Sequence, residues 1–374
     1  MKRRPRKART QPRKIDFEID HLDPLGQGVS KLGGDITFVA RTLPGEAGVA
    51  TVYKQAKGVQ FARLQNLAKS ADNRVEPECP HFEECPGCQF LHTDYASELL
   101  YKKASLHRHL GVLGVDLDAI DVLPAPRRLA YRNRVQLHYR HKYIGMLDPV
   151  SDQVLEVPQC KIMRAELQPA FSRLYQGEWQ KDHPGRGHCE LYFKSGEVSI
   201  SWDGSYAHGG FSQVYEEMNL ALQERVQTQL ESLAAKRLLD IFSGSGNLSD
   251  AFAAAGGERV MIDNYAGPEA VANRDNFYQM DLYQEQTLSN FIRRLGGMDI
   301  DTLLIDPPRK GFPDLDSWVK KINPRHVLYV SCNPASLARD LRGLESRFRM
   351  KSVQLLDMFP ATAHFETFVV LQMR

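Results

Sequence analysis

Five short apolar runs, separated by stretches long enough for a helix, fill the C-terminal part of the sequence. They are RLLDIF (237–242), ERVMID (258–263), DTLLID (301–306), HVLYVS (326–331) and FVVLQM (368–373), and a helical pattern that ends near residue 235 precedes them. Strands that alternate with helices form a sheet with much parallel pairing, because a parallel pair needs a long crossover connection. We therefore predict an α/β domain over residues 206–374.

The first of these strands runs into a turn with the pattern Gly244-x-Gly246, in LLDIFSGSGNLSDAFA (238–253). Residues without a β-carbon let the backbone approach a ligand closely at the carboxyl end of a strand. Asp263 ends the next strand, where a carboxylate can accept hydrogen bonds from both hydroxyls of a ribose. Ser249 stands where a dinucleotide fingerprint has its third glycine. The pattern favours an adenosine ligand over a nicotinamide dinucleotide, and a plain strand-to-helix turn is the alternative.

A third strand ends in Asp306-Pro307-Pro308, within LLIDPPRKG (303–311). Two prolines fix the backbone and remove two amide donors, which suits a rigid platform at the mouth of a sheet. In methyltransferases that use S-adenosyl-L-methionine (adenosylmethionine), an aromatic residue normally follows such a motif when the target is an exocyclic amine. Arg309 follows here, so methylation of an amino group is disfavoured.

A cysteine follows the fourth strand, in SCNPASL (331–337), and a glutamate precedes the last strand, in FPATAHFETFVVL (359–371). Carbon 5 of uracil attacks a sulfonium methyl group only after a thiolate has added to carbon 6. A base must then remove the proton from carbon 5 so that the thiol can leave. Cys332 and Glu366 fit these two roles if both face one crevice above the sheet. A small buried side chain is the other interpretation of Cys332.

With these motifs the chain resembles the RNA uracil-C5 methyltransferases, in particular bacterial 23S ribosomal RNA members that carry an N-terminal TRAM domain and a [4Fe-4S] cluster. The resemblance runs from about residue 15 to the C-terminus. It is carried by CPHFEECPGC (79–88), FSQV (211–214), DIFSGSGNLS (240–249), DPPRKG (306–311), SCNPASLARDL (331–341) and DMFPATAHFET (357–367).

The resemblance implies a class I (Rossmann-like) domain that methylates carbon 5 of a specific uridine in 23S ribosomal RNA with adenosylmethionine. It gives Cys332 the role of the nucleophile and Glu366 the role of the base. The positions that contact adenosylmethionine in the family are occupied by Gln213, Phe242, Asn247, Asp263, Asp281 and Asp306. A transfer RNA substrate, or a catalytically silent RNA-binding assembly factor, is the alternative.

Three of the six cysteines, Cys79, Cys85 and Cys88, lie within ten residues, and Cys160 follows in VPQCKI (157–162). Cytosolic thiols stay reduced, so this clustering favours metal binding over disulfides. Four thiolates suit either a [4Fe-4S] cluster or a tetrahedral zinc ion. The spacing matches that of the family, and the resemblance therefore implies the iron-sulfur cluster, with an architectural role.

The N-terminal half is predicted to be mostly β. Residues 15–70 alternate short β-favouring runs with Gly, Pro and Asp turns, which indicates an OB-like barrel of about five strands, the TRAM domain of the resemblance. Residues 75–205 are expected to form a central iron-sulfur and RNA-binding domain. Within it, RRLAYRNRVQLHYRHK (127–142) combines basic residues with Tyr131 and Tyr139, as an RNA surface or a solvated strand face does.

The composition is that of a globular protein, with 42% hydrophobic and 25% charged residues in a chain of 374. No apolar stretch approaches the roughly 18 residues of a membrane helix, and no hydrophobic signal segment follows the basic N-terminus. We expect a cytoplasmic monomer that binds RNA and no membrane. Residues 1–14 hold eight Lys or Arg and no acid, which predicts a disordered tail, either solubilising or binding nucleic acid.

Overall fold

The structure is a computed structural model, and it describes residues 13–204, 213–264 and 276–374. The chain divides into two compact units. The first holds residues up to 101 together with 361–363, and the second holds residues 102–360 and 364–374. The division falls inside helix α1 (Tyr95–Leu110). None of the helices in the described ranges is long and apolar enough to cross a bilayer.

The first unit contains a six-stranded sheet in the order β1-β5-β6-β4-β3-β2, one strand more than expected. Its strands are β1 (Arg13–Glu18), β2 (His21–Leu22), β3 (Gly28–Ser30), β4 (Ile36–Ala40), β5 (Ala47–Ala56) and β6 (Val59–Lys69). Alternate residues of these strands point inward, as in β4 and β5, and build a small apolar core. Arg13 and Lys14, expected in the disordered tail, pair with Val52 and Thr51 in the sheet, whereas residues 1–12 lie outside the described residues.

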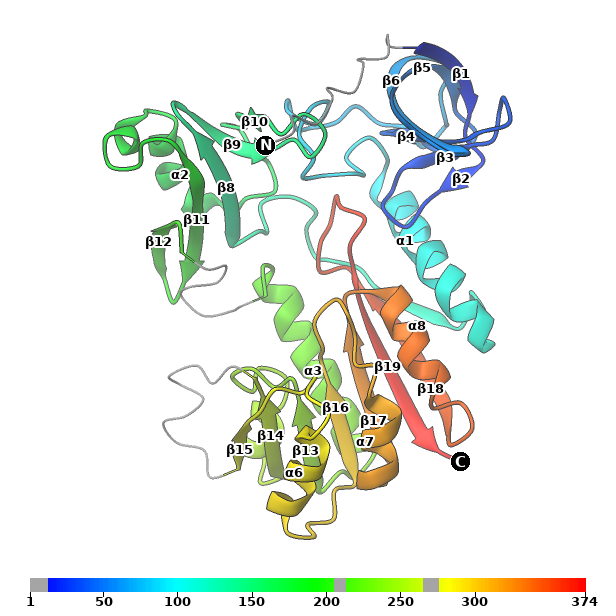
Figure 1. The fold of residues 1–374 in the computed structure, drawn as a ribbon, viewed down its shortest axis with the longest axis vertical. Coiled ribbons are helices and arrows are strands. Elements are labelled where there is room, and N and C mark those ends of the chain that lie inside the picture. Colours follow the sequence, from blue (N-terminus) through cyan, green and yellow to red (C-terminus); the bar gives the residue numbers. More distant parts are fainter. Residues whose placement is uncertain (1–12, 205–212, 265–275) are drawn as a thin grey trace, which may run out of the picture. The chain divides into compact units, whose positions relative to one another are not determined.

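The second unit is built on an eight-stranded sheet in the order β15-β14-β13-β16-β17-β19-β18-β7 (Figure 1). Its strands are β7 (Ile120–Leu123), β13 (Arg237–Ile241), β14 (Glu258–Asp263), β15 (Phe277–Gln279), β16 (Thr302–Ile305), β17 (His326–Ser331), β18 (Phe348–Leu356) and β19 (Glu366–Met373). The five strands β13 to β17 are mutually parallel, and β19 runs antiparallel to both of its neighbours, β17 and β18. All five predicted strands are present.

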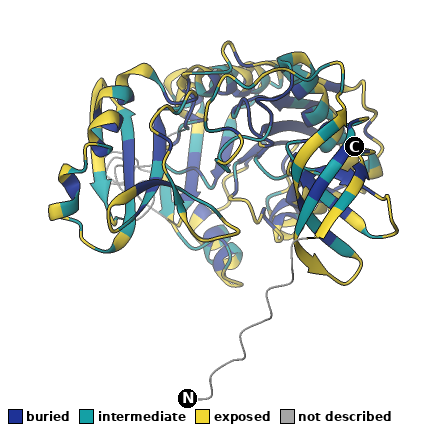
Figure 2. Cartoon of the chain, turned by 90° about the horizontal axis from the view of Figure 1, so that it is seen from above, coloured by how far each residue is buried: buried dark blue, intermediate teal, exposed yellow. Residues whose placement is uncertain are grey.

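Every residue of β16 and β17 is buried, as expected for parallel strands that are covered on both faces. Figure 2 shows buried residues of the chain in dark blue. The connecting helices are α3 (Glu216–Ser232), α4 (Asp250–Ala254), α6 (Thr287–Leu295), α7 (Leu315–Ile322) and α8 (Pro334–Arg342). The strand order reverses at β13, with β14 on one side and β16 on the other. Ligands of open α/β sheets bind beyond the carboxyl ends of the strands at such a point.

The second unit also contains an antiparallel sheet in the order β10-β9-β8-β11-β12. Its strands are β8 (Arg134–Arg140), β9 (Tyr143–Leu147), β10 (Val154–Leu155), β11 (Arg186–Lys194) and β12 (Glu197–Trp202), and α2 (Gln168–Leu174) lies between β10 and β11 in the chain. These elements belong to the range expected for the central domain. Residues 75–101 of that range belong to the first unit.

The prediction that Tyr131 and Tyr139 offer stacking faces to RNA is wrong. Tyr131 is 1% exposed and stacks on Tyr215 with ring centroids 4.7 Å apart. Tyr139 is 3% exposed and donates a hydrogen bond from its hydroxyl to Asp203 over 2.7 Å. Arg134 of the same stretch is also buried and pairs with Glu190. These side chains stabilise the interior of the second unit.

Candidate active site

The glycine turn after β13 is held against the end of β14. The amides of Phe242 and Ser243 donate to the Ile262 carbonyl over 3.0 and 3.3 Å, and the Gly244 amide donates to Asp263 Oδ2 over 2.9 Å. Phe242 has φ of 63°, a left-handed conformation that is rare for a residue with a β-carbon. The turn is therefore fixed by its contacts with β14, and Asp263 lies beside it as the sequence predicted.

Three carboxylates gather at the carboxyl ends of β13, β14 and β16. Burial raises the pKa of Asp240 to about 7, although the Ser249 hydroxyl donates to it over 2.5 Å. Burial also raises the pKa of Asp306 to about 7, and the negative charges of Asp240 and Asp263 add to this rise. Because like charges this close disfavour full ionisation, a cation bound among them would stabilise the ionised carboxylates.

An aromatic group lies next to these carboxylates. The ring of Phe242 meets the rings of Phe312 and Tyr283 at centroid distances of 5.1 and 5.6 Å. The ammonium group of Lys310 lies 3.1 Å from the centroid of the Tyr283 ring, which is a cation–π contact. Asp281 follows β15 and accepts hydrogen bonds from the Tyr283 amide and the Gln284 side chain, each over 3.0 Å. The backbone and side chain of Tyr283 thus connect Asp281 with the aromatic group.

Hydrogen bonds to neighbouring residues fix the positions of Asn247 and Gln213. The Asn247 side chain exchanges hydrogen bonds with Asn219 of α3 over 3.0 and 2.9 Å, and it accepts one from Gln223 over 2.8 Å. The carbonyl of Gln213 accepts from the Asn133 side chain over 3.0 Å. Residues 211–212, the start of the FSQV motif, lie outside the described residues. Asn247 therefore anchors the glycine turn to α3.

The antiparallel direction of β19 brings Glu366 to the same edge of the sheet as Cys332. Ser331 at the end of β17 pairs with Thr367, so Cys332 and Glu366 are the next residues outward on the two strands. Glu366 is buried, and its Oε2 atom has no hydrogen-bond partner among the described residues. Burial and the charge of Asp306 raise the pKa of Glu366 well above its usual value. A raised pKa makes the ionised form of this carboxyl a stronger base.

The thiol of Cys332 is partly exposed at this edge. Burial, and then the charges of Glu366 and Asp306, raise its pKa to about 12, whereas the Arg309 guanidinium lowers it. Arg309 also lowers the pKa of Glu366, so its charge acts on both groups. From the sequence, Arg309 received no role beyond excluding an amine substrate. A cationic residue directly after the two prolines was the sequence feature that could have predicted its electrostatic role, because this loop faces a thiol and two carboxyls.

The predicted metal ligands divide between the two units. Cys79, Cys85 and Cys88 are half-buried in a loop of the first unit, where the Gly87 amide donates to Cys85 Sγ over 3.4 Å. Cys160 is half-buried in the second unit. Over the ranges that the structure describes, no group of three or more His, Cys, Asp or Glu side chains is arranged to hold a metal. Cys189 is fully buried in β11.

Residues 204–374 match the sequence model of the family described as tRNA (Uracil-5-)-methyltransferase. This range includes the glycine turn, the Asp-Pro-Pro loop, Cys332 and Glu366. The chain is an adenosylmethionine-dependent RNA uracil-C5 methyltransferase. Cys332, Glu366 and the three carboxylates at the carboxyl ends of β13, β14 and β16 all lie within the range that matches the family model.

The methyltransferase also has relatives that match it over its full length. It is 27% identical to the 23S rRNA (uracil(1939)-C(5))-methyltransferase RlmD of Shewanella woodyi, over 100% of this chain and 99% of the relative. The protein of the same name from Shewanella amazonensis is also 27% identical, over 100% of this chain and 98% of that one. The methyltransferase is thus a distant homologue of these enzymes from end to end.

A solved structure has the same fold. It is the Pyrococcus abyssi tRNA (uracil-54, C5)-methyltransferase in complex with S-adenosyl-L-homocysteine, with a TM-score of 0.73 and 21% identity over 96% of this chain and 99% of that one. This likeness confirms the class I fold expected for the methyltransferase domain, together with an N-terminal β-sheet.

Proposed function

We propose that the enzyme methylates carbon 5 of a specific uridine in 23S ribosomal RNA through a covalent adduct with Cys332. The choice of ribosomal RNA is supported by the full-length relatives, which are named for that substrate. The covalent route is supported by one observation above the others: Glu366, buried and with an unsatisfied oxygen, lies next to Cys332 at the ligand-binding edge of the sheet. The reaction requires a thiol that attacks carbon 6 and a nearby base that removes the proton from carbon 5.

The reaction balances with these two residues. The thiolate of Cys332 forms a bond to carbon 6, and the electron pair of the ring's carbon 5–carbon 6 double bond moves into an enolate. Carbon 5 then forms its bond to the methyl group as the bond between that group and the sulfonium sulfur breaks, which leaves S-adenosyl-L-homocysteine. Carbon 5 now carries both the methyl group and a proton. Glu366 takes that proton, the double bond re-forms, and the bond between carbon 6 and the Cys332 sulfur breaks. Because the thiol pKa is raised to about 12, its own proton must pass to solvent at this partly exposed edge before the attack, and the charge of Arg309 favours that loss.

The carboxylate group and the aromatic group fit adenosylmethionine, which when bound supplies a methyl group on a positively charged sulfur. We propose that Asp263 accepts from the ribose hydroxyls and that Asp306 faces the cationic part of the ligand. Phe242 offers an apolar surface beside them. Gln213, Asn247 and Asp281 complete the set of residues that we propose for this ligand, with Asn247 acting through the turn that it anchors.

We also propose that Cys79, Cys85, Cys88 and Cys160 bind a [4Fe-4S] cluster and that the N-terminal sheet is a TRAM domain. The support is the spacing of the cysteines and a donor set of thiols, one of which already accepts a hydrogen bond from a backbone amide. Four protein thiolates complete the ligation of such a cluster. Anaerobic purification should give a brown protein with about four iron atoms per chain. A colourless protein with one zinc ion would contradict this assignment.

The test of the proposed function compares three proteins on three RNAs. The unchanged enzyme, Cys332→Ala and Glu366→Gln are incubated with methyl-labelled adenosylmethionine and with 23S ribosomal RNA, 16S ribosomal RNA or transfer RNA. We expect labelled 5-methyluridine in 23S RNA with the unchanged enzyme alone. Glu366→Gln should accumulate an RNA–protein adduct that survives denaturing electrophoresis, because the adduct forms but cannot lose its proton. Cys332→Ala should give neither adduct nor product.

Transfer RNA is the second candidate substrate, because the matching family is described by that substrate. Label in transfer RNA instead of 23S RNA would favour it. Normal turnover by Cys332→Ala would exclude the covalent route for either RNA. Binding of RNA by the unchanged protein without any transfer of label would favour an assembly factor.

A further inference from the structure

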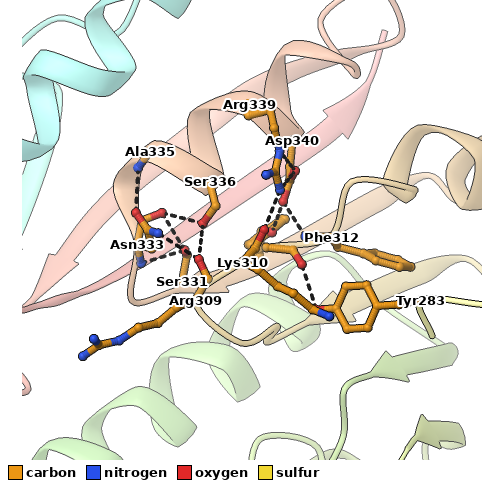
Figure 3. A network of polar contacts seen from close by, with 12 residues as sticks. Tyr283, Arg309, Lys310, Phe312, Ser331, Asn333, Ala335, Ser336, Arg339 and Asp340 are labelled. Carbon is orange, nitrogen blue, oxygen red and sulfur yellow. Dashed lines mark hydrogen bonds and ion pairs between the residues drawn. The ribbon is translucent and has the colours of Figure 1, made fainter. Parts of the chain in front are cut away.

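The loop from Asp306 to Phe312 is held against α8 by side chains of that helix (Figure 3). The carbonyl of Arg309 accepts from Asn333 Nδ2 over 2.8 Å and from Ser336 Oγ over 3.1 Å. Asn333 also caps α8, because its side chain accepts from the Ala335 amide. The residue directly after Cys332 is therefore the N-cap of the helix that holds this loop.

Asp340 lies at the centre of a second group of contacts (Figure 3). Its Oδ2 atom accepts from the Phe312 amide and from the Tyr329 hydroxyl, each over 2.6 Å. Its Oδ1 atom accepts from Nε and Nη2 of Arg339, over 2.9 and 2.7 Å. Arg339 Nη2 also donates to the Lys310 carbonyl over 2.7 Å. The Asp340 side chain is fully buried, and its acceptor positions are occupied.

The loop backbone approaches the Asp340 carboxylate so closely that Gly311 is required. Gly311 has φ of 72°, and a β-carbon there would lie 2.5 Å from Asp340 Oδ2 and 2.7 Å from Arg339 Nη2. Only glycine combines this conformation with this distance at little cost. Asp340 thus joins three parts of the chain: β17, which ends before Cys332, the loop that carries Asp306 and Arg309, and α8.

We infer that Asp340 is a positioning residue for methyl transfer, which fixes Arg309 and Asp306 relative to Cys332. The inference rests on the proposed function of Cys332. The network engages the backbone of Arg309 and leaves its side chain pointing away from the bonded atoms (Figure 3). The guanidinium charge still acts on Cys332 and Glu366, so the position of the loop decides how strongly it acts. A displacement of about 1 Å can cost about 100-fold in rate.

The substitution Asp340→Asn tests this inference with little change in volume. An amide replaces one acceptor oxygen by a donor, which then faces either the Phe312 amide and the Tyr329 hydroxyl or the Arg339 guanidinium. We expect kcat for methyl transfer to fall about 10- to 100-fold. The matched control is Asp316→Asn on α7, where the carboxylate pairs with Lys320 at the protein surface. The control should keep kcat and KM of the unchanged enzyme.

A double-mutant cycle separates positioning from a general loss of stability. If Asp340 acts through Arg309, then Asp340→Asn should lower kcat less than about threefold in an Arg309→Ala background. Losses that multiply in the double variant would overturn the inference, and so would an Asp340→Asn enzyme that behaves like the control. Thermal unfolding of each variant shows that it is folded. If Asp340→Asn does not fold, Tyr329→Phe replaces it in the cycle, since this variant removes one donor only.

The outcome also separates this inference from the proposed function. An unchanged enzyme that places no methyl group on uracil in any RNA refutes the proposed function. An active enzyme with multiplying losses in the cycle refutes only the positioning role of Asp340.

Discussion

The affinity of the enzyme for adenosylmethionine should rise about tenfold between pH 6 and pH 8. The group responsible is Asp306, whose pKa is raised to about 7 by burial and by the charges of Asp240 and Asp263. A carboxyl with this pKa is ionised in about one molecule in eleven at pH 6 and in about ten of eleven at pH 8. A cationic ligand binds the ionised form and lowers the pKa of Asp306 toward its ordinary value of about 3.9. Affinity is therefore gained above pH 7 and lost below it.

The corresponding free energy is about 1.4 kcal/mol, which isothermal titration calorimetry resolves easily. S-adenosyl-L-homocysteine is the matched ligand, since it lacks the charge on sulfur, and its affinity should vary much less with pH. Asp306→Asn should remove most of the variation for adenosylmethionine. Asp240, whose pKa is also about 7, is the other group that could cause it, and Asp240→Asn tests that alternative directly. The charge of Asp306 also acts on Glu366 and Cys332.

Equal affinities for adenosylmethionine at pH 6 and pH 8 would refute this reasoning. The same variation with both ligands would show that the charge on sulfur does not interact with the carboxylates.

Two further perturbations test contacts of the second unit. Lys102→Met should lower the free energy of unfolding by about 3 to 5 kcal/mol, because it removes the ammonium group that pairs with the buried Asp357 carboxylate. The control is Lys320→Met, which removes an exposed ion pair with Asp316 and should lower this free energy by at most about 1 kcal/mol. Urea denaturation measures both, and equal losses would contradict the argument. Gly311→Ala should lower both stability and kcat, because the added methyl group meets the Asp340 carboxylate at a positive φ; a Gly311→Ala enzyme with unchanged kcat would show that the loop tolerates displacement.

Much of the methyltransferase domain could be predicted from the sequence because its strands are short, apolar and separated by helix-sized segments. Cys332, Asp306 and Asp263 each follow or end such a strand, and parallel strands bring these ends to one edge. Three strands were missed: β18 and β7 at one end of the sheet and β15 at the other edge. β18 carries charged residues on its exposed positions, and β7 comes from a distant part of the chain and joins the sheet only through β18.

Contacts between segments far apart in the sequence could not be predicted from local pattern. The stretch 127–142 has the composition of an RNA surface, yet Tyr131, Tyr139 and Arg134 are buried. Residues of other segments satisfy their polar groups, as Asp203 does for the Tyr139 hydroxyl and Glu190 for Arg134. The role of Asp340 could not be predicted for the same reason, because the residues around it in the sequence do not indicate that the Phe312 amide donates a hydrogen bond to it. A buried polar side chain can be predicted only together with its partner.

The reversed direction of β19 has a geometric consequence for the chemistry. The strand is eight residues long, from Glu366 to Met373. If β19 ran parallel to β17, its first residue would lie about 25 Å away, at the opposite rim of the sheet from the sulfur atom. One change of chain direction therefore lets a residue that begins a strand meet a residue that follows its neighbour, and so the two groups proposed for catalysis can flank a single flat ring.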